Sequence, residues 1–273
     1  MPFEARLFTL GKAVTHIMAF FMARILSDSQ VIQGDPLKNI RVVLTQPSHP
    51  GNIGATARAM KTMGLSALYL VNPRHFPHAD ADTRATGALD VLQQARVCAN
   101  LPEALRDCVL AVATSSRQRE LPHEVTDARA VARTLIDTAT THPVALVFGN
   151  ETSGLSNEEA GFCNLWAYVP TNPAYASLNL ASAVQIFAYE LRMAFIKGEV
   201  RPAAEFAPAT SEQVEQLYRH CEQTMIATGF LDPANPKRLL PRLRRLLARA
   251  RLESDEVNIL RGFLNTASKP PPK

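Results

Sequence analysis

Short apolar runs recur along the first part of the chain. Each run is continuous or rich in β-branched residues and is bounded by turn residues, which is typical of strands buried on both faces. The runs are 40–45, 67–72, 96–99, 109–114, 144–149 and 165–170. Stretches that predict helices lie between several of them, at 54–63, 101–107 and 127–139. This alternation predicts an α/β fold with a mostly parallel sheet and helices on both faces.

The pattern changes after Phe195. Residues 198–210 are rich in proline, alanine and charge, which predicts a linker between a domain at 38–197 and a module at 211–273. The module contains three stretches with helical periodicity and no strand between them, at 211–229, 236–251 and 253–266. We therefore expect a small all-helical C-terminal module.

Positive charge is concentrated in this module. The run "KRLLPRLRRLLARAR" at 237–251 carries seven positive charges and no acid, although the net charge of the whole chain is only +4. A solvated helix face would explain it, but uncompensated charge of this density usually meets a polyanion. Nucleic acid is the expected partner, and the candidate contacts are Lys237, Arg238, Arg242, Arg244, Arg245 and Arg249.

The overall composition excludes several classes of protein. Of 273 residues, 47% are apolar and 20% charged, which is ordinary for a globular protein. No window of eighteen apolar residues exists, so we expect no membrane span. The four cysteines show no C-x-x-C spacing and no nearby histidine pair, which favours free thiols in a reducing cytoplasm and no metal site.

The first 37 residues do not follow the pattern of the domain. The apolar run at 17–23 is short for a signal peptide, Glu4 lies near the start, and no small-x-small cleavage site follows. We expect a disordered or mis-assigned leader, with Met18 or Met22 as possible starts, that has no role in the fold.

Ligands of an open parallel sheet bind at the carboxyl ends of its strands, so the loops there are the candidates for chemistry. The loop and helix at 45–64 contain Gly51 and Gly54 but no G-x-G-x-x-G, and no acid ends the second strand. A nicotinamide enzyme is therefore disfavoured. Arg58 in this helix suits a forked grip on phosphate, although most helical arginines are merely solvated.

Two further loops are richer in polar residues than their helices require. In "GNETSGLSNEEA" (149–160), Ser156 and Glu159 predict a capping box, which leaves Gly149, Glu151 and Gly154 unexplained. A glycine on each side of one carboxylate indicates a tight turn whose backbone approaches a ligand. In "VPTNPAYASLNLASAV" (169–184), Ser177 is either the N-cap of the next helix or a ligand-binding group.

Three motifs together resemble a known family. "SHPGNIGATARAMKTMG", "VALVFGNETSGLSNEE" and "NPAYASLNLASAVQIFAYELR" are similar in order and spacing to the three motifs of the SPOUT class of RNA methyltransferases. The likeness is greatest to bacterial tRNA 2′-O-methyltransferases that modify the first anticodon-loop nucleotide, position 32, C or U. "TSSRQRELP" and the basic tail resemble the same proteins, and the likeness covers residues 38–266.

The resemblance implies a deep trefoil knot in the C-terminal part of the sheet and a bound S-adenosyl-L-methionine. The segment Tyr-Ala-Ser-Leu-Asn at 175–179 would thread the knot and hold the cofactor with its backbone. Small residues suit such a cradle, because the adenine and methionine parts lie against main chain. The implied cradle is Thr114, Ser115, Ser116, Gly149, Val169, Ala176, Ser177 and Leu178.

The resemblance also implies roles for polar side chains. It gives Arg58 the catalytic position, but because arginine stays protonated we expect it to anchor the RNA backbone beside the 2′-oxygen. Tyr175 and Ser177 would orient the ribose, and Arg117 and Arg119 would contact RNA or a partner subunit. The family implies a homodimer with sites at the subunit interface and no metal, while the basic helices would hold tRNA through its phosphates.

One residue departs from the family pattern, since Asn150 stands where many relatives carry arginine. Three other functions remain open. A sister enzyme would methylate another tRNA position or rRNA, a non-catalytic RNA-binding factor would lack cofactor affinity, and a small-molecule transferase would ignore RNA.

Overall fold

The computed structural model describes residues 35–115, 125–197 and 207–267. The leader at Met1–Gly34 lies outside the described residues. Although the sequence assigns residues 35–37 to the leader, Asp35 caps the 3-10 helix η1 (Pro36–Asn39), and Pro36 and Leu37 are buried. The folded domain therefore includes these three residues.

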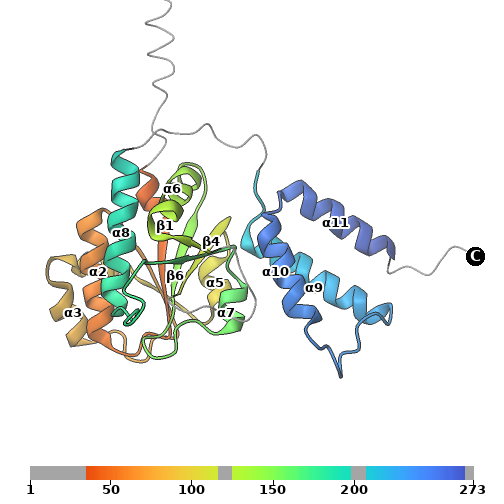
Figure 1. The fold of residues 1–273 in the computed structure, drawn as a ribbon, viewed down its shortest axis with the longest axis horizontal. Coiled ribbons are helices and arrows are strands. Elements are labelled where there is room, and N and C mark those ends of the chain that lie inside the picture. Colours follow the sequence, from red (N-terminus) through yellow and green to blue (C-terminus); the bar gives the residue numbers. More distant parts are fainter. Residues whose placement is uncertain (1–34, 116–124, 198–206, 268–273) are drawn as a thin grey trace, which may run out of the picture. The chain divides into compact units, whose positions relative to one another are not determined.

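A single sheet of seven strands organises the described part of the first domain (Figure 1). Its order is β3-β2-β1-β6-β4-β7-β5, and each neighbouring pair is parallel. The strands are β1 (Ile40–Thr45), β2 (Ala67–Val71), β3 (Arg96–Cys98), β4 (Leu110–Thr114), β5 (Val125–Asp127), β6 (Val144–Phe148) and β7 (Leu165–Tyr168). The six predicted strands are confirmed, with ends shifted by at most two residues, while β5 was not predicted.

The helices follow the strands in alternation, as the sequence predicts. The first domain has α2 (Pro50–Met63), α3 (Ala79–Ala85), η2 (Thr86–Ala88), α4 (Leu89–Gln93), α5 (Leu101–Leu105), α6 (Ala128–Ala139), α7 (Asn157–Gly161) and α8 (Leu180–Ile196). The predicted start of α2 was wrong by four residues, because His49 caps the helix and Pro50 occupies its first turn. The capping box of Ser156 and Glu159 at α7 is confirmed.

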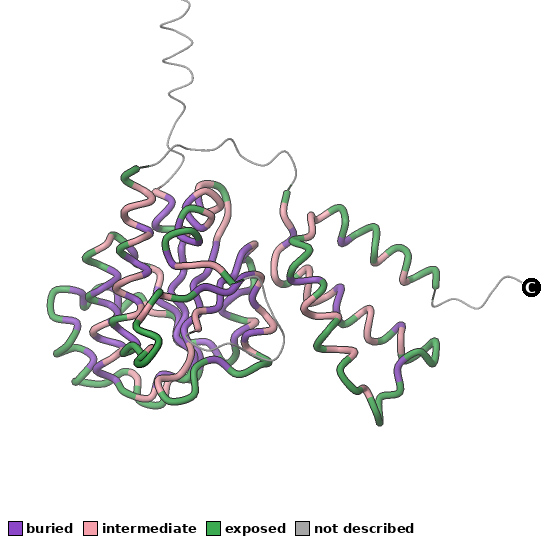
Figure 2. Tube along the Cα trace, in the orientation of Figure 1, coloured by how far each residue is buried: buried purple, intermediate pink, exposed green. Residues whose placement is uncertain are grey.

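Two apolar clusters cover the two faces of the sheet. Along β1, Val42 and Leu44 join the cluster under α2, α6 and α8, while Val43 joins the cluster under α5 and α7. Successive side chains of a strand point to opposite faces, so a strand buried on both sides is a continuous apolar run. Figure 2 shows the strands buried and the connecting loops largely exposed.

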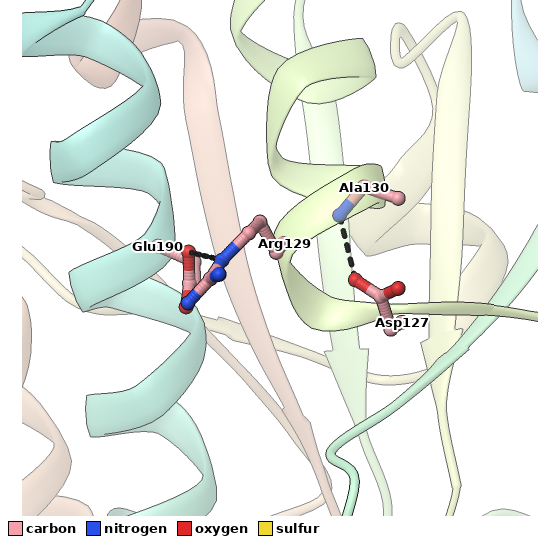
Figure 3. Close-up of polar contacts among 4 residues, drawn as sticks. All are labelled: Asp127, Arg129, Ala130 and Glu190. Carbon is pink, nitrogen blue, oxygen red and sulfur yellow. Dashed lines mark hydrogen bonds and ion pairs between the residues drawn. The ribbon is translucent and has the colours of Figure 1, made fainter.

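Helices α6 and α8 lie side by side over one face and are linked at their surface (Figure 3). The guanidinium of Arg129 donates to both carboxylate oxygens of Glu190, at 3.1 and 3.2 Å. Asp127 caps α6 by accepting from the backbone N–H of Ala130 at 2.8 Å. These contacts fix the start of α6 beside the long helix of the third motif.

The C-terminal module is helical, as predicted. Its helices are α9 (Ser211–Ala227), α10 (Leu239–Ala250) and α11 (Ser254–Ala267), with a small apolar core of their own. The last residues of the predicted linker belong to it, since the Ala209 N–H donates to Leu252 O at 2.8 Å and Thr210 caps α9. The remaining domain boundaries and the trefoil knot stay predictions.

None of the helices in the described residues combines the length and apolar content that a membrane span requires. Across the same residues, no group of three or more histidine, cysteine, aspartate or glutamate side chains could hold a metal ion.

Candidate functional site

A network of hydrogen bonds at the carboxyl edge of the sheet is centred on Glu151, which follows β6. Its carboxylate accepts from the N–H and hydroxyl of Ser48 at 2.9 and 2.8 Å and from the N–H of His49 at 3.2 Å. It also accepts from the side-chain amide of Asn52 at 2.9 Å. One half-buried carboxylate thus joins the loop after β1 to the loop after β6.

These contacts keep Glu151 ionised. Partial burial disfavours the charged carboxylate, but the hydrogen bonds from Asn52 and Ser48 outweigh this effect and lower the pKa of Glu151 to about 2. The carboxylate is therefore a fixed negative charge at neutral pH. It is an acceptor for backbone and side-chain donors and is poorly suited to remove a proton.

The network continues into the third motif through Asn179. The Asn179 amide donates to Asn52 Oδ1 at 3.0 Å, and its own oxygen accepts from the N–H groups of Ala181 and Ser182 at 3.0 and 3.3 Å. Asn179 is therefore the N-cap of α8. The interpretation of Ser177 as that cap was wrong, and the exposed Ser177 side chain is left for another role.

The loop after β6 needs its glycine for its own packing. A Cβ on Gly149 would lie 2.1 Å from the backbone of Gly154 and Leu155. The two ends of the turn can therefore approach this closely only with glycine at position 149. Asn150, the departure from the family pattern, donates from its side chain to Gln46 O at 2.7 Å. It therefore ties this loop to the end of β1 and supplies no charge.

Two of the predicted cradle residues lie at the carboxyl end of β4. The Thr114 hydroxyl donates to Val147 O, and the Ser115 N–H donates to Ala167 O, each at 3.0 Å. Val169, just beyond β7, is half-buried against the apolar core. Ser116 lies outside the described residues, as do Arg117 and Arg119.

The segment before α8 is irregular and accessible. Residues 170–179 form no helix or strand, and the Tyr175 side chain is 78% exposed. Within the described residues, the N–H groups of Ala176, Ser177 and Leu178 donate no hydrogen bond. Main-chain donors of this kind, next to small or apolar side chains, can accept a ligand with both polar and apolar parts.

Arg58 is exposed on α2. In the described part of the chain its side chain makes no hydrogen bond or ion pair. An unpaired guanidinium is available to an outside anion, and arginine suits phosphate because its planar fork can form two parallel hydrogen bonds.

The candidate RNA contacts of the module separate into two groups. Lys237, Arg238, Arg242 and Arg249 are exposed. Arg244 instead forms an ion pair with Glu215 and lies over the rings of Tyr218 and Phe162, at 4.0 and 4.5 Å from their centroids.

Arg245 also differs from the exposed group. Its Nε is buried without a hydrogen-bond partner among the described residues. The structure therefore places Arg244 and Arg245 in the packing of the protein more than on its free surface.

Comparison with known proteins agrees with the motifs. The model of the SpoU rRNA Methylase family matches residues 39–189, and that of the tRNA methyltransferase TrmJ C-terminal domain matches residues 212–271. The TrmJ protein of Pseudomonas aeruginosa is 46% identical over 85% of this chain and 95% of its own length. This chain belongs to the TrmJ family of RNA methyltransferases. The TrmJ protein of Escherichia coli K12 is 47% identical over 84% of this chain and 94% of its own length.

The fold of this TrmJ family member agrees with a solved relative. The crystal structure of TrmJ from Zymomonas mobilis ("Z. mobilis ZM4") matches with a TM-score of 0.75 and 34% identity, over 84% of this chain and 99% of that chain. A probable methyltransferase from Bordetella pertussis is 42% identical over 60% of this chain and 99% of its own, with a TM-score of 0.56.

The sequence did not identify the central network of this TrmJ family member. It noted Glu151 as unexplained and assigned no role to Ser48, Asn52 or Asn179. Polar residues at the carboxyl ends of parallel strands were the available signal, since such loops meet at one edge. The pairing of Glu151 with Asn52, 99 residues apart in the chain, required the structure.

Proposed function

We propose that this chain transfers a methyl group from S-adenosyl-L-methionine to a ribose 2′-hydroxyl of tRNA, at the first anticodon-loop nucleotide. The relatives are named tRNA (cytidine/uridine-2′-O-)-methyltransferases, and the name of the Pseudomonas protein adds adenosine. The observation that carries the proposal is the Glu151 network, which joins all three motifs at the carboxyl edge of the sheet. A tRNA substrate also favours a cytoplasmic location.

The residues at this edge fit the cofactor. The free N–H groups of Ala176, Ser177 and Leu178 supply donors, and the exposed Leu178 side chain supplies an apolar contact. S-adenosyl-L-methionine supplies an electrophilic methyl group when bound. In this proposal it is held by Thr114, Ser115, Ser116, Gly149, Val169, Ala176, Ser177 and Leu178.

The chain's own side chains then position the acceptor. Arg58 binds the phosphate next to the ribose, because its guanidinium stays protonated and cannot serve as a base. Tyr175 and Ser177 orient the ribose so that its 2′-oxygen lies in line with the methyl group. Alignment of this kind can lower the activation barrier by about 7 kcal/mol where the geometry is well fixed. The hydroxyl proton passes to phosphate or water.

A homodimer would complete this arrangement. Within the described residues no hydrogen bond or ion pair links Arg58, Tyr175 and Ser177, and Tyr175 is largely exposed. A second copy could enclose them, with Arg117 and Arg119 contacting the partner or the RNA. Exposed Lys237, Arg238, Arg242 and Arg249 would hold tRNA phosphates at a distance from the reaction.

The test is incubation of purified protein with labelled S-adenosyl-L-methionine and unmodified bulk tRNA, then nuclease digestion and mass spectrometry. We expect 2′-O-methylation at position 32. A label at another position would overturn the target and keep the chemistry. Binding of tRNA without transfer would favour a non-catalytic RNA-binding factor.

An Arg58→Ala variant tests the mechanism separately. We expect methyl transfer to be lost and cofactor binding, measured by calorimetry, to stay within about twofold, because Arg58 belongs to the acceptor side. Unchanged turnover would remove Arg58 from the mechanism. Arg133→Ala is the matched control, since Arg133 is also an exposed helical arginine.

A further inference from the structure

A hollow lies at the opposite edge of the sheet from the Glu151 network. It has a volume of about 500 Å³ and opens at the amino ends of β1, β2 and β3. Lys38, Arg41 and Arg96 line it together with Tyr69 and Gln94. Neither the motifs nor the proposed chemistry uses these residues.

Arg41 forms the floor of this basic hollow. It is only 8% exposed, and its guanidinium lies 4.8 Å from the centroid of the Tyr69 ring. It donates to Ala104 O at 2.8 Å and to the carboxylate of Asp107. A guanidinium has five N–H donors, so these two bonds fix its position without using all of its donors.

The positive charge of the hollow is only partly compensated. Arg96 lies 5.6 Å from the same Tyr69 ring, is exposed, and forms no ion pair in the described part of the chain. Lys38 is likewise exposed and unpaired there. Asp107 faces the cluster, but it is already bound to Arg41. Three cations with one acid leave two positive charges around a concave surface.

This arrangement differs from an ordinary solvated helix face. The cations come from three separate segments, before β1, within β1 and at the start of β3, and two of them, Arg41 and Arg96, lie over one aromatic ring. Charges of one sign in a concave site with low-dielectric walls reinforce one another and attract a counter-ion. Arginine presents a planar donor fork that matches a phosphate, and the Gln94 amide adds a neutral donor.

We propose that this basic hollow binds a phosphate group of the substrate tRNA, away from the nucleotide that is modified. The inference rests on the proposed function, since it takes tRNA as the source of the phosphate. The six residues of β1 place the hollow about 20 Å from the carboxyl edge. A tRNA is an extended polyanion with a phosphate at every nucleotide, so one tRNA can reach both edges.

The experiment compares Lys38→Gln and Arg96→Gln with the wild-type protein. Each removes one exposed charge, whereas replacing the buried Arg41 would endanger the fold. The dissociation constant for tRNA is measured at several salt concentrations. The logarithm of the binding constant falls linearly with the logarithm of the salt concentration. We expect this dependence to become shallower, with the magnitude of its slope about one lower for each variant, as for the loss of a phosphate contact.

Arg133→Gln is the matched control, because it removes an exposed arginine of α6 that lies in none of the three motifs and forms no ion pair among the described residues. Its slope should equal that of the wild type. If the hollow variants also keep the wild-type slope, tRNA does not bind there and the inference is overturned.

A second measurement distinguishes a phosphate of tRNA from free phosphate as the ligand. It also distinguishes failure of this inference from failure of the proposed function. Inorganic phosphate should raise the melting temperature of the wild type more than that of Arg96→Gln. A shift of this kind with unchanged tRNA slopes would keep a phosphate site but overturn its assignment to tRNA. Methyl transfer with neither effect would refute the hollow alone, whereas absent transfer and absent tRNA binding would refute the proposed function.

Discussion

Replacing Glu151 with glutamine should destabilise the protein in a manner that depends on pH. The carboxylate accepts four hydrogen bonds, two of them from Ser48 and the others from His49 and Asn52. Glutamine keeps the shape but offers one oxygen and an NH₂ group that faces donors. The substitution therefore removes the charge and leaves some of these donors without an acceptor.

The pKa of Glu151 gives the magnitude. A decrease from 4.5 to about 2 corresponds to about 3 kcal/mol at roughly 1.4 kcal/mol per unit. Because the side chain is only half-buried, solvent screening reduces this to about 1–2 kcal/mol. The folded-state pKa is the lower one, so the stabilisation is complete above pH 4.5 and is lost as the pH falls from 4.5 towards 2.

Urea denaturation at pH 7 and at several values below pH 4.5 measures this effect. We expect Glu151→Gln to lose about 1–2 kcal/mol at neutral pH. The difference from wild type should shrink as the pH falls. Glu158→Gln, an exposed neighbour, is the control and should change little. A difference for Glu151→Gln that stays constant from pH 7 to pH 3 would refute the assignment of a stabilising charge.

Three further substitutions test other contacts. Gly149→Ala should cost about 1–3 kcal/mol in urea denaturation because its Cβ would meet backbone, whereas Gly87→Ala meets nothing within 4 Å and should be tolerated. Asn179→Ala should cost about 1 kcal/mol as a lost N-cap, while Ser177→Ala should keep stability and lower methyl transfer. Glu215→Gln should not raise tRNA affinity in a binding titration; a clear rise would mean that its α10 arginine partner binds RNA.

Most strands were predictable because a buried strand is recognisable from the apolar residues of its own short segment. β6 is buried on both faces and is a continuous apolar run, and β1 is apolar except for Arg41 and Thr45, so neither needs knowledge of its neighbours. β5 was missed for the opposite reason. It has three residues, lies at the edge of the sheet, and begins with Val125, which is 55% exposed. Its pairing with β7 comes from tertiary structure.

The site was predictable only in part, because its residues meet across long sequence separations. The sequence located the loops, since polar residues after buried strands are visible locally. It considered Ser177 as the cap of α8 and not Asn179, although both precede the apolar stripe. The choice depends on where the backbone becomes helical and on the bond from Asn179 to Asn52, 127 residues away.

The basic run of α10 shows how packing changes the meaning of a charge. In sequence the seven cations at 237–251 are equivalent candidates for contact with RNA. In the helix, Arg244 lies on the same face as the buried Leu247 and Ala248, three and four residues later, so its charge faces Glu215 and two aromatic rings. Arg242 and Arg249 are seven residues apart and exposed. Only such exposed cations can release counter-ions from tRNA, so the salt dependence of binding should reflect fewer contacts than the charge count.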